Sequence, residues 1–516
     1  MIGKTIRSAM IALAIATGGA AHAQSLRIAL GADTTSMDPH FQDIGPNITV
    51  QKHIFDALIH TNAKGELVPA LATAWRITDD PTLWEFTLRR GVAFHDGSPF
   101  TARDAVFSLK RAPDVPNSPV AMRRYLEDIA SVEAVDDFTL RIRTKEPSPI
   151  MPNNLVPIAM VSEKIGPRAD AGGFNTGVHA IGTGPFRFVE WVSGSHVKLA
   201  ANPTYWGEKP AWSDVTLRPI VNSGARVAAL LAGDVDVIAD VPPIDVPRLS
   251  RESGLVLSRG VSSRVIFWAM DVFRETTPHV TAKDGAAIAN PLRDLRVRRA
   301  IALALDRNII VRQVMDEIAV SAQQIVPPGI VGHRTDMVLP SVDIAAARAL
   351  MAAAGLSNGF KMTIHTTANR YPNDLKQAQA VAQMLARIGI EVNVISLPLA
   401  IFFTEARKYE FSFNLVGWGF TSGDSYVILR EALQTRASNN YGRWSSAEVD
   451  RLLTVARTEM DAKTREEALV QVQRVALADI ALIPTHFQVN VWAARKGLKV
   501  DARMDEATLA QAVRRE

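Results

Sequence analysis

The sequence contains no cysteine among its 516 residues. No disulfide can therefore hold the chain together, and no thiolate can act as a nucleophile. Lipid attachment to a cysteine, the usual tether of bacterial surface lipoproteins, is excluded for the same reason. A chain of this length suggests two or three lobes, and their packing alone must stabilise the fold.

Long apolar runs and a strong charge imbalance are also missing. After the N-terminus, no segment reaches the about 18 uninterrupted apolar residues that suggest a membrane-spanning helix. The formal net charge is +4, from 57 Lys and Arg against 53 Asp and Glu. Acidic and basic residues are interspersed without a basic stripe, so nucleic acid is not an expected partner.

Residues 1–23 have the pattern of a cleavable export signal. Lys4 and Arg7 precede a short apolar run at 9–16, and Ala21-His22-Ala23 fits the small-x-small cleavage rule. We expect Gln24 to begin a mature protein that is exported and then soluble. Together with the lack of cysteine, this favours a free periplasmic protein of a Gram-negative bacterium, without a lipid anchor.

Catalytic and metal-binding motifs are absent. The sequence has neither H-E-x-x-H nor G-x-S-x-G, and its 11 histidines show no metal-ligand spacing. His95 and His486 are interpreted as structural or surface residues. We therefore predict no catalytic residue, no metal ligand and no cofactor. Gly423-Asp424-Ser425 resembles the start of an esterase motif, so an exported hydrolase stays open as an alternative.

The most informative stretch runs from Tyr409 to Tyr426. Apolar and polar residues alternate from Tyr409 to Leu415, which predicts a half-buried strand. The strand leads into Gly417-Trp418-Gly419-Phe420 and then into Thr421-Ser422-Gly423-Asp424. Aromatic area, close backbone and hydroxyl groups are what a pocket for a small solute needs. A core strand followed by an ordinary turn is the alternative.

Other segments predict an α/β protein. Thr101 is the expected N-cap of a helix over 102–110, with Asp104 in the capping-box position. The helix at 374–388 passes directly into a strand at 390–397, a connection typical of sheets covered by helices. We further expect strands at 25–30, 83–88, 480–487 and 489–493, and helices at 51–59, 294–315 (with a solvated face of arginines), 341–354, 447–457 and 463–479.

The run from Leu67 to Arg111 closely resembles the signature of the family 5 extracellular solute-binding proteins. Other segments match in the same order, among them residues 181–186, 202–207, 230–236 and 294–307. These proteins are periplasmic receptors of peptide, nickel and related ABC importers. The resemblance implies a two-lobed α/β fold, that of a type II periplasmic binding protein of the large peptide-binding class. Its expected parts are lobe I at 24–266 with an extra subdomain inserted at about 50–180, lobe II at 267–480, and a C-terminal segment, 481–516, returning to lobe I.

The resemblance also suggests how a ligand is held. Peptide-binding members have a Trp-x-x-Asp element beginning where Trp418 stands, and its Asp pairs with the ligand's amine. Here the fourth position is Thr421, which cannot neutralise an amine, so we expect free peptides to bind poorly unless Asp424 substitutes. Arg370 resembles the arginine that binds the ligand carboxylate, with a surface arginine as the alternative. The expected ligand-binding residues are Thr35, Ser36, Met37, Arg370, Trp418, Gly419, Phe420, Thr421, Ser422 and Asp424.

The expected function is capture of a peptide-like or other small polar solute between two lobes, and its delivery to an inner-membrane ABC permease. The expected protein is a monomer that binds and signals without turnover. A metal chelate or a sugar derivative is an alternative ligand.

Overall fold

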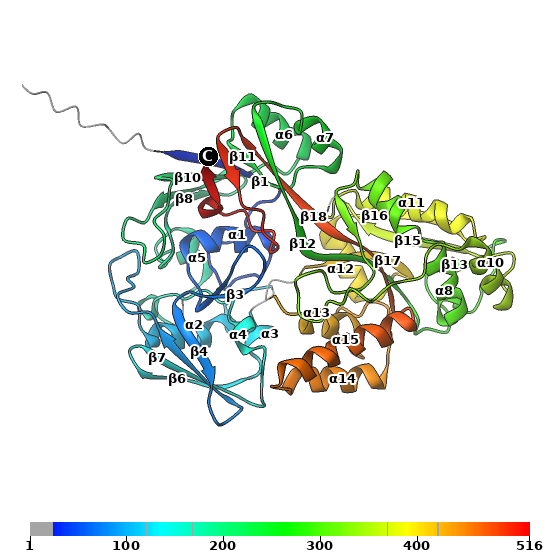
Figure 1. Ribbon diagram of the computed structural model, residues 1–516, viewed down its shortest axis with the longest axis horizontal. Coiled ribbons are helices and arrows are strands. Elements are labelled where there is room, and N and C mark those ends of the chain that lie inside the picture. The colour runs from blue at the N-terminus through cyan, green and yellow to red at the C-terminus, as the bar shows by residue number, and fades with distance from the viewer. Residues whose placement is uncertain (1–23, 120–121, 168, 369, 420–422) are drawn as a thin grey trace, which may run out of the picture.

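The computed structural model describes residues 24–119, 122–167, 169–368, 370–419 and 423–516. Within them, one 12-stranded sheet extends through both lobes of the molecule, in the order β13-β15-β17-β12-β18-β11-β1-β10-β9-β8, with β14 beside β18 and β16 beside β15 (Figure 1). Its strands are β1 (Ser25–Leu30), β8 (Phe186–Val192), β9 (His196–Ala201), β10 (Asp214–Pro219), β11 (Val237–Ile238), β12 (Leu255–Met270), β13 (Val280–Thr281), β14 (Ala319–Ser321), β15 (Lys361–Thr367), β16 (Glu391–Leu397), β17 (Phe413–Trp418) and β18 (Leu482–Arg495).

Two long antiparallel strands, β12 and β18, cross from one lobe to the other (Figure 1). Their lobe I ends pair over 255–261, and β11 pairs with that end of β18. Their lobe II ends pair from Val265 onward, and β17 pairs with that end of β12. The register shifts between Val261 and Val265. The crossover between the lobes is therefore a local irregularity in one shared sheet.

Lobe I contains the β11-β1-β10-β9-β8 part of the sheet and a smaller four-stranded sheet, β4-β5-β7-β6. In α2, the Thr101 amide and hydroxyl both donate to Asp104 Oδ2, at 2.8 and 3.1 Å, which confirms the predicted capping box. The α-helices and strands of this half outside the 12-stranded sheet are α1 (Gly45–Ile54), β2 (Ile59–Thr61), β3 (Leu67–Pro69), β4 (Ala72–Ile77), β5 (Leu83–Leu88), α2 (Ala102–Arg111), α3 (Arg123–Leu126), β6 (Ile129–Asp136), β7 (Thr139–Thr144), α4 (Met151–Asn154), α5 (Ala171–Asn175), α6 (Ser223–Ala232) and α7 (Val246–Leu249).

Lobe II buries both faces of its sheet. Along β12, Ile266 and Trp268 belong to one hydrophobic core, and Val265 and Phe267 to another, because successive strand residues point to opposite faces. The first core includes residues of α8 (Leu295–Ala304), α10 (Ile344–Ala353) and α11 (Asp374–Ala386). The second includes residues of α12 (Leu399–Arg407), α13 (Tyr426–Leu433), α14 (Ala447–Thr458) and α15 (Ala462–Ala478).

Because helices cover both faces of the lobe II sheet, one prediction about β17 is wrong. The alternation from Tyr409 to Leu415 predicted a half-buried strand, but Ser412 and Asn414 are as buried as Phe413 and Leu415. The strand begins only at Phe413. Helices lie on both sides of the sheet, so the polar residues of the alternating pattern do not reach solvent.

Two helix predictions are also wrong in part. The helix expected at 294–315 ends at Ala304, because Leu305 is extended and Asp306 caps a separate short turn, α9 (Arg307–Ile309). Its arginines do not form one solvated face, since Arg298 and Arg307 are buried. The helix expected at 51–59 ends earlier, at Ile54.

The lobes also touch at their rim, away from the crossing strands. Arg430 of α13 pairs with Glu127 at 3.1 Å, and Arg457 of α14 pairs with Glu146 and, at 3.8 Å, with Asp128. Ile150, next to α4, packs with the lobe II core. The lobes are therefore held together at two separate places.

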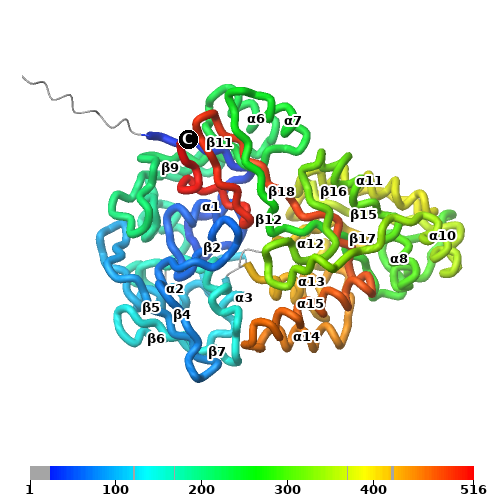
Figure 2. The backbone as a smooth tube through the Cα atoms, viewed as in Figure 1, coloured from blue at the N-terminus to red at the C-terminus, as the bar shows by residue number. Residues whose placement is uncertain are grey.

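The chain after β18 returns along lobe I, where the red segment lies beside the blue α1 in Figure 2. The Ala510 amide donates to His53 Nε2 at 2.9 Å, and the Met504 amide donates to the Ala63 carbonyl at 2.9 Å. Near the C-terminus, β19 (Leu498–Val500) and β20 (Val513–Arg515) form a short antiparallel pair. No helix of the described residues is both long and apolar enough to span a membrane.

Candidate functional site

The loops that follow parallel strands in each lobe bring charged side chains together between the lobes. In lobe I, β1 is parallel to β10 and β11, and Asp240 follows β11. In lobe II, β15 is parallel to β16 and β17, and Arg370 follows β15. The carboxyl ends of such strands are the usual ligand sites of open α/β sheets. The crossing strand β12 contributes Arg264, and the C-terminal segment contributes Glu506.

Arg264 and Glu506 form a bidentate ion pair at the crossover. Arg264 lies at the register shift of β12, and its Nε and Nη2 donate to Glu506 Oε1 and Oε2 at 2.9 and 2.7 Å. Ser262 Oγ also donates to Glu506 Oε1, at 2.6 Å. Burial alone would raise the pKa of Glu506, but Arg264 and these hydrogen bonds outweigh it, so the pKa is lowered. The pair is satisfied internally and forms a fixed part of the site.

Asp240 is a carboxylate without a hydrogen-bonded partner among the described residues. Its backbone adopts a φ of 54°, and its Oδ2 lies so close to Gly31 that a Cβ there would be 2.7 Å away. The neighbouring Arg226 donates to backbone carbonyls instead, including those of Ala239 and Asp240 at 3.0 and 2.8 Å. Asp240 is exposed to solvent, but surrounding protein partly desolvates its carboxylate. This desolvation, reinforced by Glu506, raises the pKa of Asp240, while Arg226 first, then Arg370 and Arg264, oppose the rise.

Arg370 is the corresponding cation of lobe II, and no acidic side chain of the described residues pairs with its guanidinium. Asp374 fixes its loop, because Asp374 Oδ2 accepts from the Arg370 amide at 3.0 Å and from Thr367 Oγ1 at 2.8 Å. The guanidinium lies 5.1 Å from the ring centre of Tyr371 and has no hydrogen-bond acceptor within the part of the chain described. Arg370 is exposed to solvent, but its guanidinium is partly desolvated by neighbouring protein atoms. Its pKa is lowered, first by this desolvation and then by the positive charge of Arg264.

We call Asp240, Arg264, Arg370 and Glu506 the interlobe charge cluster, because each of them shifts the pKa of others in the set. Within this set the two positive and two negative charges balance, and Arg226, which donates to backbone carbonyls, is a further cation beside Asp240. Since Arg264 and Glu506 neutralise each other, one acid from lobe I and one base from lobe II are left to interact with a ligand.

The end of β17 lies against this cluster. A Cβ on Gly419 would come within 3.0 Å of Arg264 Nη2, so glycine allows the guanidinium to approach the backbone. Tyr371 Oη donates to the Gly417 carbonyl at 3.0 Å. Trp418 is half-buried and pairs with Val265 of the crossing strand. Three of the residues expected at the site, Arg370, Trp418 and Gly419, are thus in one neighbourhood.

The other expected site residues differ in position. Ser36 and Met37 are buried inside lobe I, where the Ser36 hydroxyl and the Met37 amide donate to Asn175 Oδ1 at 3.0 and 2.9 Å. Thr35 is exposed. Asp424 is buried and ion-paired with Arg465, so its charge is already neutralised inside lobe II. Phe420, Thr421 and Ser422 lie outside the described residues.

Reasoning from the sequence missed Asp240, Arg264 and Glu506. Asp240 had a usable signal, because it follows the short apolar run 237–239 and lies two residues before the pair Pro242-Pro243, the pattern of a loop after a buried strand. Arg264 and Glu506 are separated by more than 200 residues, and no local pattern relates them. Within the described residues, no three His, Asp or Glu side chains form a group that could hold a metal ion.

Comparison with known proteins identifies the family. The model of the bacterial extracellular solute-binding proteins, family 5, matches residues 66–440. The chain belongs to this family. The dipeptide-binding protein of Escherichia coli K12 is 25% identical to this solute-binding protein over 439 residues, covering 80% of this chain and 79% of the relative. The glutathione-binding protein GsiB of Pectobacterium atrosepticum is 28% identical over 465 residues, covering 88% and 86%.

A solved structure supports the same two-lobed fold. The periplasmic binding protein DppA of Helicobacter pylori, in complex with the peptide STSA, superimposes with a TM-score of 0.79 at 25% identity. The match covers 95% of this chain and 98% of that one. The family and the two-lobed α/β fold expected from the sequence are confirmed, and members of this family are binding proteins.

Proposed function

We propose that this protein captures a small zwitterionic solute between its lobes and delivers it to the permease of an ABC importer in the inner membrane. The observation that carries the proposal is a pair of opposite charges, Asp240 in lobe I and Arg370 in lobe II, whose charged groups have no hydrogen-bonded partner among the described residues. The guanidinium of Arg370 matches a ligand carboxylate, and the Asp240 carboxylate matches a ligand amine. Export by residues 1–23, without a lipid anchor, would place the protein free in the periplasm.

Peptide-like solutes fit this arrangement, as do other small molecules carrying both charges. The relatives named above bind a dipeptide, glutathione and a peptide, according to their names and titles. The sequence led us to expect weak binding of free peptides, because Thr421 cannot neutralise an amine. Asp240 supplies a counter-charge from the other lobe, so the position of Thr421 no longer argues against a free amine.

The test compares a dipeptide with its N-acetylated form and with its C-terminal amide by calorimetry, after native mass spectrometry of the freshly purified protein to find a retained ligand. We expect the free dipeptide to bind more tightly than either blocked form. A hydrogen bond to a charged group contributes about 1.5–3 kcal/mol, or roughly 10- to 150-fold in affinity.

The variants assign the two charges. Asp240→Asn should abolish the preference over the acetylated form, and Arg370→Gln the preference over the amide. Asp234→Asn and Arg387→Gln are the matched controls, since both positions are exposed and neither acts on the pKa of Asp240 or Arg370. Equal affinity for free and blocked dipeptides would refute the zwitterion assignment. A strong gain of peptide affinity in Thr421→Asp would restore the interpretation based on Thr421.

A further inference from the structure

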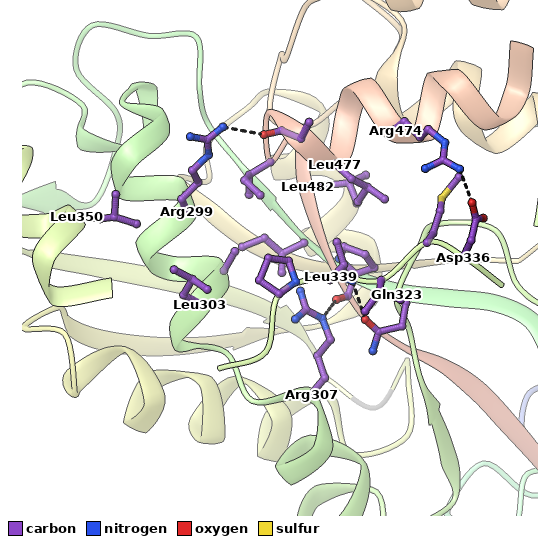
Figure 3. Close-up of a pocket in the computed structure, with 18 residues that line it drawn as sticks. Arg299, Leu303, Arg307, Gln323, Asp336, Leu339, Leu350, Arg474, Leu477 and Leu482 are labelled. Carbon is purple, nitrogen blue, oxygen red and sulfur yellow. Dashed lines mark hydrogen bonds and ion pairs between the residues drawn. The ribbon is translucent and has the colours of Figure 1, made fainter. Parts of the chain in front are cut away.

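A pocket lies entirely within lobe II. It has a volume of about 440 Å³, is open to solvent on one side, and is lined by residues of α8, α15, the start of β18 and the segment 336–340 (Figure 3). This volume is within the range of about 300–1,000 Å³ that is typical of small-molecule sites. Its walls are mainly apolar, formed by Leu303, Leu339, Leu350, Leu477, Leu482 and Ile483. None of the residues that line it belongs to the interlobe charge cluster.

A buried arginine lines this pocket. Arg307 is 9% exposed, and Figure 3 shows its guanidinium directed toward the middle of the pocket, between Leu303 and Gln323. Its Nε donates to the Pro484 carbonyl at 2.8 Å, where the pairing of β12 with β18 is irregular. Neither Nη1 nor Nη2 has a hydrogen-bonded acceptor in the described part of the chain. One edge of a buried guanidinium is therefore available to a ligand.

Among the described residues, no acidic side chain that lines the pocket pairs with Arg307. Arg474 and Asp336 pair with each other at 2.9 Å near the rim, and Arg299 adds a further exposed positive charge. Gln323 Oε1 accepts from the Leu339 amide at 3.0 Å. Burial lowers the pKa of Arg307 to about 10, and the neighbouring Asp306 opposes this shift. Arg307 thus remains a cation at neutral pH.

We propose that this lobe II pocket binds a small amphipathic carboxylate, such as a medium-length alkyl carboxylate. The carboxylate lies against the free edge of Arg307, whose planar donors match a planar two-oxygen acceptor. The alkyl chain lies against the leucines of the walls, where burial of apolar surface stabilises it. The site is separate from the interlobe charge cluster, so a ligand here does not compete directly for Asp240 or Arg370.

Calorimetry on the full mature chain measures the binding of octanoate, 1-octanol and acetate. Comparing these three compounds separates the contribution of the carboxylate charge from that of the apolar chain. We expect octanoate to bind with one-to-one stoichiometry, octanol at least tenfold more weakly, and acetate without measurable heat. Arg307→Gln should weaken octanoate at least tenfold and leave octanol unchanged. Arg387→Gln, an exposed arginine elsewhere in lobe II, is the matched control.

A second variant tests the site without removing the Arg307–Pro484 hydrogen bond. Leu303→Trp fills the pocket and should abolish octanoate binding, while circular dichroism shows an unchanged fold. Octanoate binding to Arg370→Gln should equal that of the wild type, which keeps this test independent of the interlobe site. The proposal is overturned if octanoate does not bind, if octanol binds equally well, or if Leu303→Trp binds octanoate like the wild type.

Discussion

Replacing Asp424 by asparagine distinguishes a structural role from a ligand-binding role. Asp424 Oδ1 and Oδ2 lie 2.8 and 2.7 Å from Arg465 Nη2 and Nη1, and the two side chains are 5% and 8% exposed. Arg465 Nε donates to the Ala456 carbonyl at 2.9 Å, so the guanidinium cannot easily move to solvent. Asp424→Asn therefore leaves a buried positive charge without its counter-charge. Breaking such a pair from one side costs about 3–5 kcal/mol.

Urea-induced unfolding at pH 7 measures this loss, and Asp336→Asn is the matched control. Asp336 also pairs with an arginine, Arg474, at 2.9 Å, but the side chains are 66% and 41% exposed. An exposed pair contributes about 0–1 kcal/mol. Replacing both buried partners, as in Asp424→Leu with Arg465→Met, should recover much of the lost stability. A loss below about 1 kcal/mol for Asp424→Asn would refute this reasoning, and a loss of ligand affinity without a loss of stability would make Asp424 a ligand-binding residue.

Two further predictions concern the rim and the effect of pH. Replacing Arg430 and Arg457 by serine removes the ion pairs at the rim, each of which contributes about 0–1 kcal/mol. Without ligand, small-angle scattering should then show a larger radius of gyration than for the wild type. An unchanged profile would mean that these pairs do not hold the lobes together. His53 donates from Nδ1 to the Thr49 carbonyl at 2.7 Å and accepts from the Ala510 amide at Nε2, and burial lowers its pKa to about 4. In the unfolded chain, the pKa of His53 is about 6.5, the ordinary value for histidine. Below that pH the unfolded chain binds a proton at His53 that the folded chain does not bind. The free energy of unfolding should therefore fall from about pH 6.5 toward about pH 4. Unfolding of wild type and His53→Gln at pH 7 and pH 5 measures this, and equal pH dependence of the two would contradict it.

Local signals predicted the elements whose chemistry is local. The Thr101 capping box was predicted from a few neighbouring residues and is present in the structure. Glycines with left-handed backbone at or after helix ends, such as Gly233 after α6, carry the same kind of local signal. The prediction failed at 294–315, where continuous apolar spacing hid the break at Leu305 and Asp306. No propensity rule separates one long helix from two shorter ones when both bury the same residues.

Burial of polar side chains could not be predicted because it depends on distant partners. The alternating pattern placed Ser412 and Asn414 on the solvent-facing side of a strand, yet both residues are buried because helices from other parts of the chain cover them. Asp424 looked available in a polar loop, while its partner Arg465 lies 41 residues further on. The same limitation hid Arg264 and Glu506, which meet only because β12 and β18 cross and the C-terminal segment returns to lobe I.

The arrangement of the interlobe charge cluster explains how binding would favour one relative position of the lobes. Arg264 and Glu506 satisfy each other at the crossover, so they need no ligand. Asp240 and Arg370 come from different lobes, and a zwitterion contacts both only when the lobes are close together. A ligand shifts a conformational equilibrium by its difference in affinity between the two states. Loss of either contact on opening would cost about 1.5–3 kcal/mol. Because this exceeds the about 0–1 kcal/mol of each exposed rim pair, the solute, more than the rim, would determine whether the lobes stay closed.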